Sequence, residues 1–126
     1  MAESVNSSST IIHTIIIVTT HPKELAGFYT NGLDLGEMET YGNEHVGFTL
    51  PNIYLGFDRL EQPLKEQPGA ISLWFEVDDL EKTFQRFVDM DANIKYGPTQ
   101  KPWGAVLAAV FDPDGNVIGL AQRGTT

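Results

Sequence analysis

Residues 111–120, FDPDGNVIGL, carry the clearest structural signal in this chain. Apolar residues flank a Pro-Asp-Gly sequence, and that arrangement is typical of two strands joined by a tight turn. The stretch therefore predicts a hairpin in which one strand ends at Phe111 and the next begins at Asn116. Within the turn, we expect Asp112 and Asp114 to bond the backbone and to take no part in chemistry.

The composition is that of one soluble globular domain. The chain has 126 residues, of which 41% are hydrophobic and 20% are charged. Its net charge of −9 argues against a nucleic-acid partner, because the phosphates would be repelled. The absence of cysteine excludes disulfides and thiolate chemistry. No apolar run is long enough to cross a membrane and no secretion signal is visible, so we expect a cytoplasmic protein.

Two helices and eight strands are expected along the chain. Pro22 suits the first position of one helix, which Asn31-Gly32 would stop, and Asp78 or Asp79 suits the cap of the other. Asp78 also has the spacing of a capping box with Glu81. Residues 1–10 are predicted to be a disordered tail, and residues 59–69 a linker. Strands are expected at 11–19, 37–41, 45–50, 53–57, 70–77, 93–96, 105–111 and 116–122.

The second half of the chain repeats the pattern of the first. Similar residues recur at a separation of 59, as in Val18 with Val77, and later at 63, as in Phe48 with Phe111 and Gly56 with Gly119. A repeat with one small insertion predicts an α+β domain built from two tandem βαβββ units. A ferredoxin-like α+β domain has the same strand and helix content, but the extra hairpin in each half favours the duplication.

Three short segments give the chain a resemblance to the vicinal oxygen chelate superfamily, which includes glyoxalases, bleomycin resistance proteins and extradiol dioxygenases. The segments are Ile11-Ile12-His13-Thr14, Phe28-Tyr29 followed by Gly32-Leu33, and Asp112-Pro113-Asp114-Gly115. The resemblance covers residues 11–123. It implies a single domain in which module 1 (11–58) and module 2 (70–123) form a curved mixed sheet, a half-barrel around a cavity.

The resemblance also implies where a metal would be bound. Enzymes of the family place one ligand on the first and last strand of each module, and these four positions fall on His13, Gly56, Ser72 and Gly119. Only His13 keeps a ligand, whereas a catalytic metal needs about three. We therefore expect no metal and no cofactor. The two glycines either open space for an organic ligand or relieve crowding where a curved strand bends.

A pocket can be assembled from strand alternation. If His13 points inward, Ile15 and Ile17 share its face. His13 and Glu76 are then candidate catalytic residues, whereas His21 and His45 are expected at the surface. Plain core packing is the competing interpretation of Tyr54, Trp74 and His13. The candidate ligand-binding residues are His13, Tyr54, Gly56, Asp58, Ser72, Trp74, Glu76, Trp103 and Gly119.

Three functions remain open. The first is a family member that has lost its metal and binds a small organic molecule, neutral or cationic, as bleomycin resistance proteins do. The second is an enzyme (lyase, isomerase or dioxygenase) that uses His13 with Glu76 or Asp58, either in a displaced metal site or in metal-free acid–base chemistry. The third is a non-catalytic homodimer. In each case we expect no nucleic acid and no membrane partner, and a homodimeric assembly.

Overall fold

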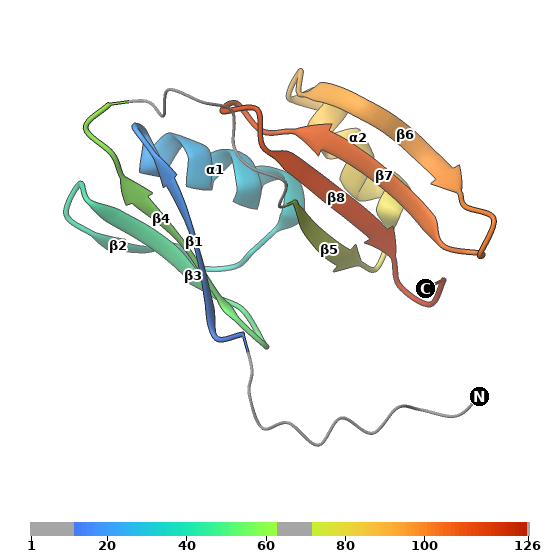
Figure 1. Ribbon diagram of the computed structural model, residues 1–126, viewed down its shortest axis with the longest axis horizontal. Coiled ribbons are helices and arrows are strands. Elements are labelled where there is room, and N and C mark those ends of the chain that lie inside the picture. Colours follow the sequence, from blue (N-terminus) through green and yellow to red (C-terminus); the bar gives the residue numbers. More distant parts are fainter. Residues whose placement is uncertain (1–11, 63–71, 126) are drawn as a thin grey trace.

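A computed structural model describes residues 12–62 and 72–125 of the chain. The predicted tail (1–10) and most of the predicted linker (63–69) lie outside the described residues. The described residues form an α+β fold of two tandem modules, as predicted (Figure 1). The first module contains β1 (Thr14–Thr19), α1 (Pro22–Leu33), β2 (Glu39–Tyr41), β3 (His45–Thr49) and β4 (Tyr54–Arg59). The second contains β5 (Leu73–Val77), α2 (Leu80–Asp89), β6 (Asn93–Gln100), β7 (Val106–Phe111) and β8 (Val117–Gln122).

Each module folds into its own four-stranded mixed sheet. The strand order is β1-β4-β3-β2 in the N-terminal sheet and β5-β8-β7-β6 in the C-terminal sheet. In each sheet the first strand of the module runs parallel to the last strand, β1 to β4 and β5 to β8. The same order in both modules supports the predicted duplication. The two sheets remain separate and do not close into a barrel.

The core lies on one face of each sheet, where the helices pack. α1 contacts β3 and β4, α2 contacts β6, β7 and β8, and the two helices touch each other (Figure 1). One hydrophobic cluster joins the modules and includes Leu25, Phe57 and Phe87, all fully buried. The opposite face of each sheet carries no helix within the described residues, and we refer to it as the open face.

The strand register corrects the predicted alignment of the repeat by one residue. Ile16 lies opposite Gly56 in the first module and Trp74 opposite Gly119 in the second, so the opening strands align at a separation of 58 rather than 59. The predicted pairing of Val18 with Val77 is therefore wrong, since Val18 is exposed whereas Val77 packs against the core. Val18 and Val77 are the same residue type but differ in burial, so residue type alone misaligns the two opening strands by one position.

The helix ends differ in detail from the prediction. His21 caps α1 without a side-chain hydrogen bond, and the helix continues through Gly32 to Leu33 before Asp34 adopts a positive φ of 55°. Gly32 lies inside the helix and allows α2 to approach closely, since a Cβ there would overlap the Phe87 ring. α2 is capped by Asp79, which accepts a bond from the Lys82 amide.

The Asp-Pro-Asp-Gly hairpin ties the two modules together. Asp112 Oδ1 accepts the backbone amides of Asp114 and Asn116, as expected for the turn. Its Oδ2 also accepts the hydroxyl of Tyr29 from α1 at 2.8 Å, and both residues are buried. Burial, reinforced by the neighbouring Asp112 carboxylate, raises the pKa of Tyr29 well above its usual range. The turn therefore holds the first helix against the last hairpin.

No helix among the described residues is long and apolar enough to cross a membrane.

Candidate functional site

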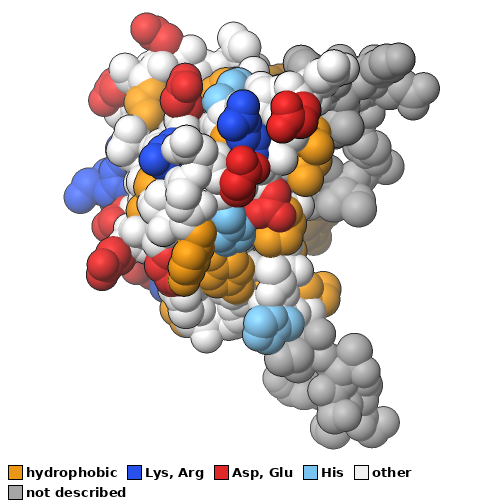
Figure 2. Space-filling model, turned by 90° about the vertical axis from the view of Figure 1, so that its left-hand side faces the viewer, with side chains coloured by type: hydrophobic (Ala, Val, Ile, Leu, Met, Phe, Trp, Pro, Cys, Tyr) orange, Lys and Arg blue, Asp and Glu red, His pale blue; other side chains and the backbone are white. Residues whose placement is uncertain are grey.

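The open face of the N-terminal sheet combines aromatic, acidic and apolar side chains. Alternation along the paired strands places every second residue there. None of these residues is a lysine or an arginine. Figure 2 views the molecule from this side and shows a histidine between hydrophobic side chains, with acidic groups beside them. The face comprises Thr14, Ile16, Val18, Glu39, Tyr41, His45, Gly47, Thr49, Tyr54, Gly56 and Asp58.

A chain of three polar side chains lies at the centre of this face. His45 Nδ1 is 2.5 Å from Asp58 Oδ1, and His45 Nε2 is 2.7 Å from the hydroxyl of Tyr54. The His45 and Tyr54 rings are stacked and nearly parallel, with 11° between their planes and 5.7 Å between their centroids. Because a carboxylate only accepts, neutral His45 donates from Nδ1 to Asp58 and leaves Nε2 to accept the Tyr54 proton.

Two glycines make room for this chain. Gly47 and Gly56 lie opposite each other on β3 and β4. A Cβ on Gly47 would overlap the hydroxyl end of Tyr54, and one on Gly56 would come within 2.8 Å of His45 Cε1. The space left by the glycines is therefore occupied by the two rings.

Tyr54 is held in its protonated form by its surroundings. Burial raises the pKa of Tyr54, and the nearby Glu39, Tyr41 and Asp58 raise it further, because a phenolate would lie among anionic groups. At neutral pH its hydroxyl is therefore a hydrogen-bond donor.

The open face of the C-terminal sheet is different. Trp74 lies opposite Gly119, and its ring occupies the space of a Cβ there, while its Nε1 donates to Ser72 Oγ at 2.9 Å. Leu107, Ala109 and Phe111 on β7 share this face with Trp74. Glu76 is paired with Arg123 at 2.8 Å rather than with a histidine. This face is mainly apolar.

The predicted site residues therefore fall into two groups. Tyr54, Gly56 and Asp58 lie on the N-terminal open face, and Trp74, Glu76 and Gly119 lie on the C-terminal one, with Ser72 beside Trp74. Trp103 lies outside both sheets, in the segment before β7, with 71% of its surface exposed.

His13 is apart from both groups. It precedes β1, is exposed, and its Nδ1 lies 2.5 Å from the hydroxyl oxygen of the neighbouring Thr14. Ile15 and Ile17 pack against the core, so they do not line an open face as the alternation from His13 had predicted. Its proposed partners, Asp58 and Glu76, bond His45 and Arg123 instead. The described residues contain no group of three side chains suited to a metal.

Sequence reasoning missed His45 and Gly47. His45 was expected at the surface, yet it is half-buried between Asp58 and Tyr54. The period-two spacings His45-x-Gly47 and Tyr54-x-Gly56-x-Asp58 were a usable signal, because they place all five residues on one face once the two strands are paired.

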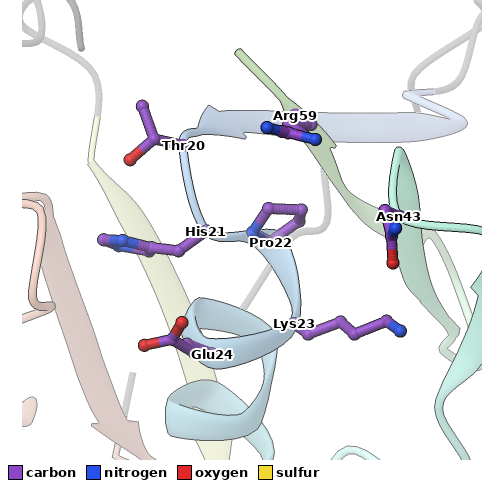
Figure 3. A pocket seen from close by; sticks show the side chains of 7 residues that line it. All are labelled: Thr20, His21, Pro22, Lys23, Glu24, Asn43 and Arg59. Carbon is purple, nitrogen blue, oxygen red and sulfur yellow. The ribbon is translucent and has the colours of Figure 1, made fainter. Parts of the chain in front are cut away.

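A separate hollow lies at the start of α1, away from the open faces. Its volume is about 200 Å³, below the usual range for a ligand cavity. Figure 3 shows Lys23 and Arg59 beside it. His21 Nε2 lies 2.7 Å from Asp114 Oδ1. The lining residues are Thr20, His21, Pro22, Lys23, Glu24, Asn43 and Arg59.

Comparison with known proteins agrees with this architecture. Residues 11–120 match the model of the Glyoxalase/Bleomycin resistance protein/Dioxygenase superfamily. No curated protein sequence matches the chain.

Solved structures share the fold at low sequence identity. A glyoxalase-related enzyme from Fulvimarina pelagi is 17% identical with a TM-score of 0.75, over 90% of this chain and 88% of that one. Lactoylglutathione lyase from Agrobacterium tumefaciens is 17% identical with a TM-score of 0.68, over 94% and 96%. TioX from Micromonospora sp. ML1 is 15% identical with a TM-score of 0.70, over 90% and 99%.

Proposed function

The chain belongs to the Glyoxalase/Bleomycin resistance protein/Dioxygenase superfamily, and from this premise we propose that it binds a small organic molecule, without a metal ion, on the open face of its N-terminal sheet. One observation carries the proposal: side-chain rings occupy the space beside Gly56 and Gly119, the positions where the resemblance places metal-binding carboxylates. Aromatic surface with a few polar groups is the usual lining of a small-molecule site.

The charge of the face indicates the class of ligand. Glu39 and Asp58 supply carboxylates, Tyr41 and Tyr54 supply aromatic rings, and no lysine or arginine shares the face. Tyr41 is 63% exposed and so is accessible to a ligand. A cation gains from both carboxylates and ring faces, whereas an anion is repelled. The proposed ligand is therefore neutral or cationic.

Three probes with one ring system and different charges test this choice. Tryptamine is cationic, indole is neutral and indole-3-acetate is anionic. We expect affinity by NMR titration to fall in that order, with shifts centred on β2, β3 and β4. Tyr41→Ala should weaken tryptamine binding about two- to five-fold, the usual size of an exposed cation–π contact. Tyr96→Ala on the other sheet is the matched control. Preferential binding of indole-3-acetate would overturn the proposal.

We propose in addition that a second copy of the chain covers part of the open faces. Ile16 and Val18 on one sheet and Trp74 on the other are each at least 40% exposed, which leaves apolar surface in water. Sedimentation should then report a dimer, and Trp74→Lys should shift it toward monomer. A wild-type monomer at every concentration would exclude this assembly.

The proposed location is the cytoplasm, since a cysteine-free domain needs no oxidising compartment.

A further inference from the structure

The open face of the N-terminal sheet has unused hydrogen-bond acceptors but no unused side-chain N–H donor. Both ring nitrogens of His45 are engaged, one with Asp58 and the other with Tyr54. The face carries no lysine, arginine, asparagine, glutamine or tryptophan, so no other side chain among its described residues has an N–H group. The Thr49 hydroxyl donates to Glu39 Oε2 at 2.6 Å. The polar atoms left for a ligand are therefore mainly acceptors.

Two carboxylates supply these acceptors. Glu39 has one oxygen bonded by Thr49, and Asp58 has one oxygen beside His45. No described residue donates to Glu39 Oε1 or Asp58 Oδ2, and the Asp58 side chain is 48% exposed. A ligand that covered these oxygens without donating to them would leave them unpaired, which costs free energy. The face therefore favours a ligand that brings its own donors.

The two carboxylates approach one hydroxyl from different strands. Glu39 is on β2 and Asp58 is on β4, with β3 between them, so the two backbones lie roughly 10 Å apart. After burial, Glu39, Tyr41 and Asp58 are the groups that raise the pKa of Tyr54, which places both carboxylates near its hydroxyl. Tyr41 adds a ring that is 63% exposed. A group bound beside the Tyr54 hydroxyl is therefore near both carboxylates and an accessible aromatic ring.

We propose that the ligand presents an amidinium or guanidinium group to this face, that is, a planar cation with N–H donors along its edge. The inference rests on the proposed binding function and narrows its ligand class. Such a cation donates in several directions within one plane, and its geometry matches that of carboxylates. Its flat surface stacks on aromatic rings, and it is more weakly hydrated than an ammonium group. A quaternary ammonium would satisfy the rings but leave the carboxylate oxygens without donors.

Two cations with one phenyl ring and different hydrogen-bonding capacity test this choice. Benzamidine carries N–H donors, whereas phenyltrimethylammonium has the same charge and none. We expect benzamidine to bind at least about five-fold more tightly by NMR titration, the size of one favourable exposed ion pair. The amide shifts should centre on β2, β3 and β4. Equal affinity, or tighter binding of phenyltrimethylammonium, would overturn the proposal.

Removal of one carboxylate should narrow the difference between the probes. Glu39→Gln keeps the length of the side chain but replaces one acceptor oxygen by an NH₂ group. Benzamidine should then lose about two- to five-fold in affinity relative to phenyltrimethylammonium. Glu81→Gln makes the same change of charge on α2 of the other module, and it should leave the ratio of the two affinities unchanged. An unchanged ratio in Glu39→Gln would also overturn the proposal.

The outcomes separate this inference from the proposed function. If tryptamine binds to the face while the two phenyl probes bind equally, the binding function stands and the amidinium class is wrong. If tryptamine, indole and both phenyl probes leave the spectrum unchanged, both proposals fail. Shifts confined to the C-terminal sheet would exclude both proposals as well.

Discussion

The two open faces of the molecule share one backbone plan and differ in chemistry. Each has a glycine in the middle of its last strand, Gly56 in β4 and Gly119 in β8, with a residue of the opening strand directly opposite. Beside Gly56 lie His45 and Ile16, and His45 is bonded to Tyr54 and Asp58. Beside Gly119 lies a single indole, that of Trp74.

The difference shows that a duplicated scaffold does not duplicate its site. On the N-terminal sheet the residues opposite each other in β3 and β4 are polar and complete a hydrogen-bonded chain. On the C-terminal sheet the corresponding strand β7 offers Ala109 and Phe111, which cannot bond Trp74. The hydrogen-bonded chain of aromatic and acidic side chains therefore lies on one face, whereas the other face is mainly apolar.

Breaking the link between the modules should have the largest effect on stability. Asp112→Ala removes the acceptor of the Tyr29 hydroxyl and of three N–H donors of the turn. The buried hydroxyl of Tyr29 then has no partner. We expect a loss of about 3 kcal/mol in the free energy of unfolding, since each unpaired buried donor costs about 1–3 kcal/mol. Urea denaturation measures it. Asp114→Ala, which loses only an exposed partner of His21, is the control, and an equal loss in both would contradict the account.

Alkaline pH should weaken the same link. The pKa of Tyr29 is raised in the folded protein by burial and by Asp112, so the folded state keeps a proton that the unfolded chain releases above about pH 10. This contribution to stability is complete below pH 10 and is lost as the pH rises further, by up to about 1.4 kcal/mol per pH unit. Urea denaturation at pH 9 to 11 should show a shallower decline in Tyr29→Phe. An equally steep decline would exclude Tyr29 as the cause.

A methyl group at Gly47 should disrupt the N-terminal face alone. Gly47→Ala would place a Cβ against the hydroxyl end of Tyr54, which must swing away from His45. We expect a cost of about 1 kcal/mol, at the low end for overpacking because the Tyr54 ring is only half-buried. Loss of the His45–Tyr54 bond should appear in the His45 ¹⁵N spectrum. Gly97→Ala, where a Cβ would lie 3.7 Å from Phe84, is the control. An unaltered His45 spectrum in Gly47→Ala would contradict the arrangement.

The equivalent change on the C-terminal face should have the smallest effect. Gly119→Ala would displace the Trp74 ring, which is already 46% exposed and moves easily into water. We expect less than about 1 kcal/mol of destabilisation, since a flexible, solvent-facing ring relieves the overlap. In a Trp103→Phe background, the remaining tryptophan emission should shift to longer wavelength. An emission that stays unchanged would place Trp74 elsewhere.

The sequence predicts the scaffold well because its signals are local. β-branched runs, Pro22 and the Asp-Pro-Asp-Gly turn each act within a few residues, so every strand and both helices occur near their predicted positions. The two-module α+β class also follows, because the repeat is visible in the order of the elements. The helix ends and the exact separation of the repeat depend on which side chains are buried, and residue type alone does not indicate that.

The site is less predictable because it depends on register between strands. The sequence locates Gly56 and Gly119 in the last strand of each module, but the side chains that fill the space beside them depend on the strand register. His45 is separated from Asp58 by 13 residues, and only the β3–β4 pairing brings them together. His13 matches a family motif, yet it lies before the strand and away from every predicted partner.

The metal content of the protein tests the central claim most directly. Native mass spectrometry after incubation with Ni²⁺, Zn²⁺ or Fe²⁺ and desalting should find the bare chain, because the family's four ligand positions offer a single histidine and rings cover the two glycines. One tightly held ion per chain, lost in His13→Ala, would contradict the account and restore a metal site built on the first strand.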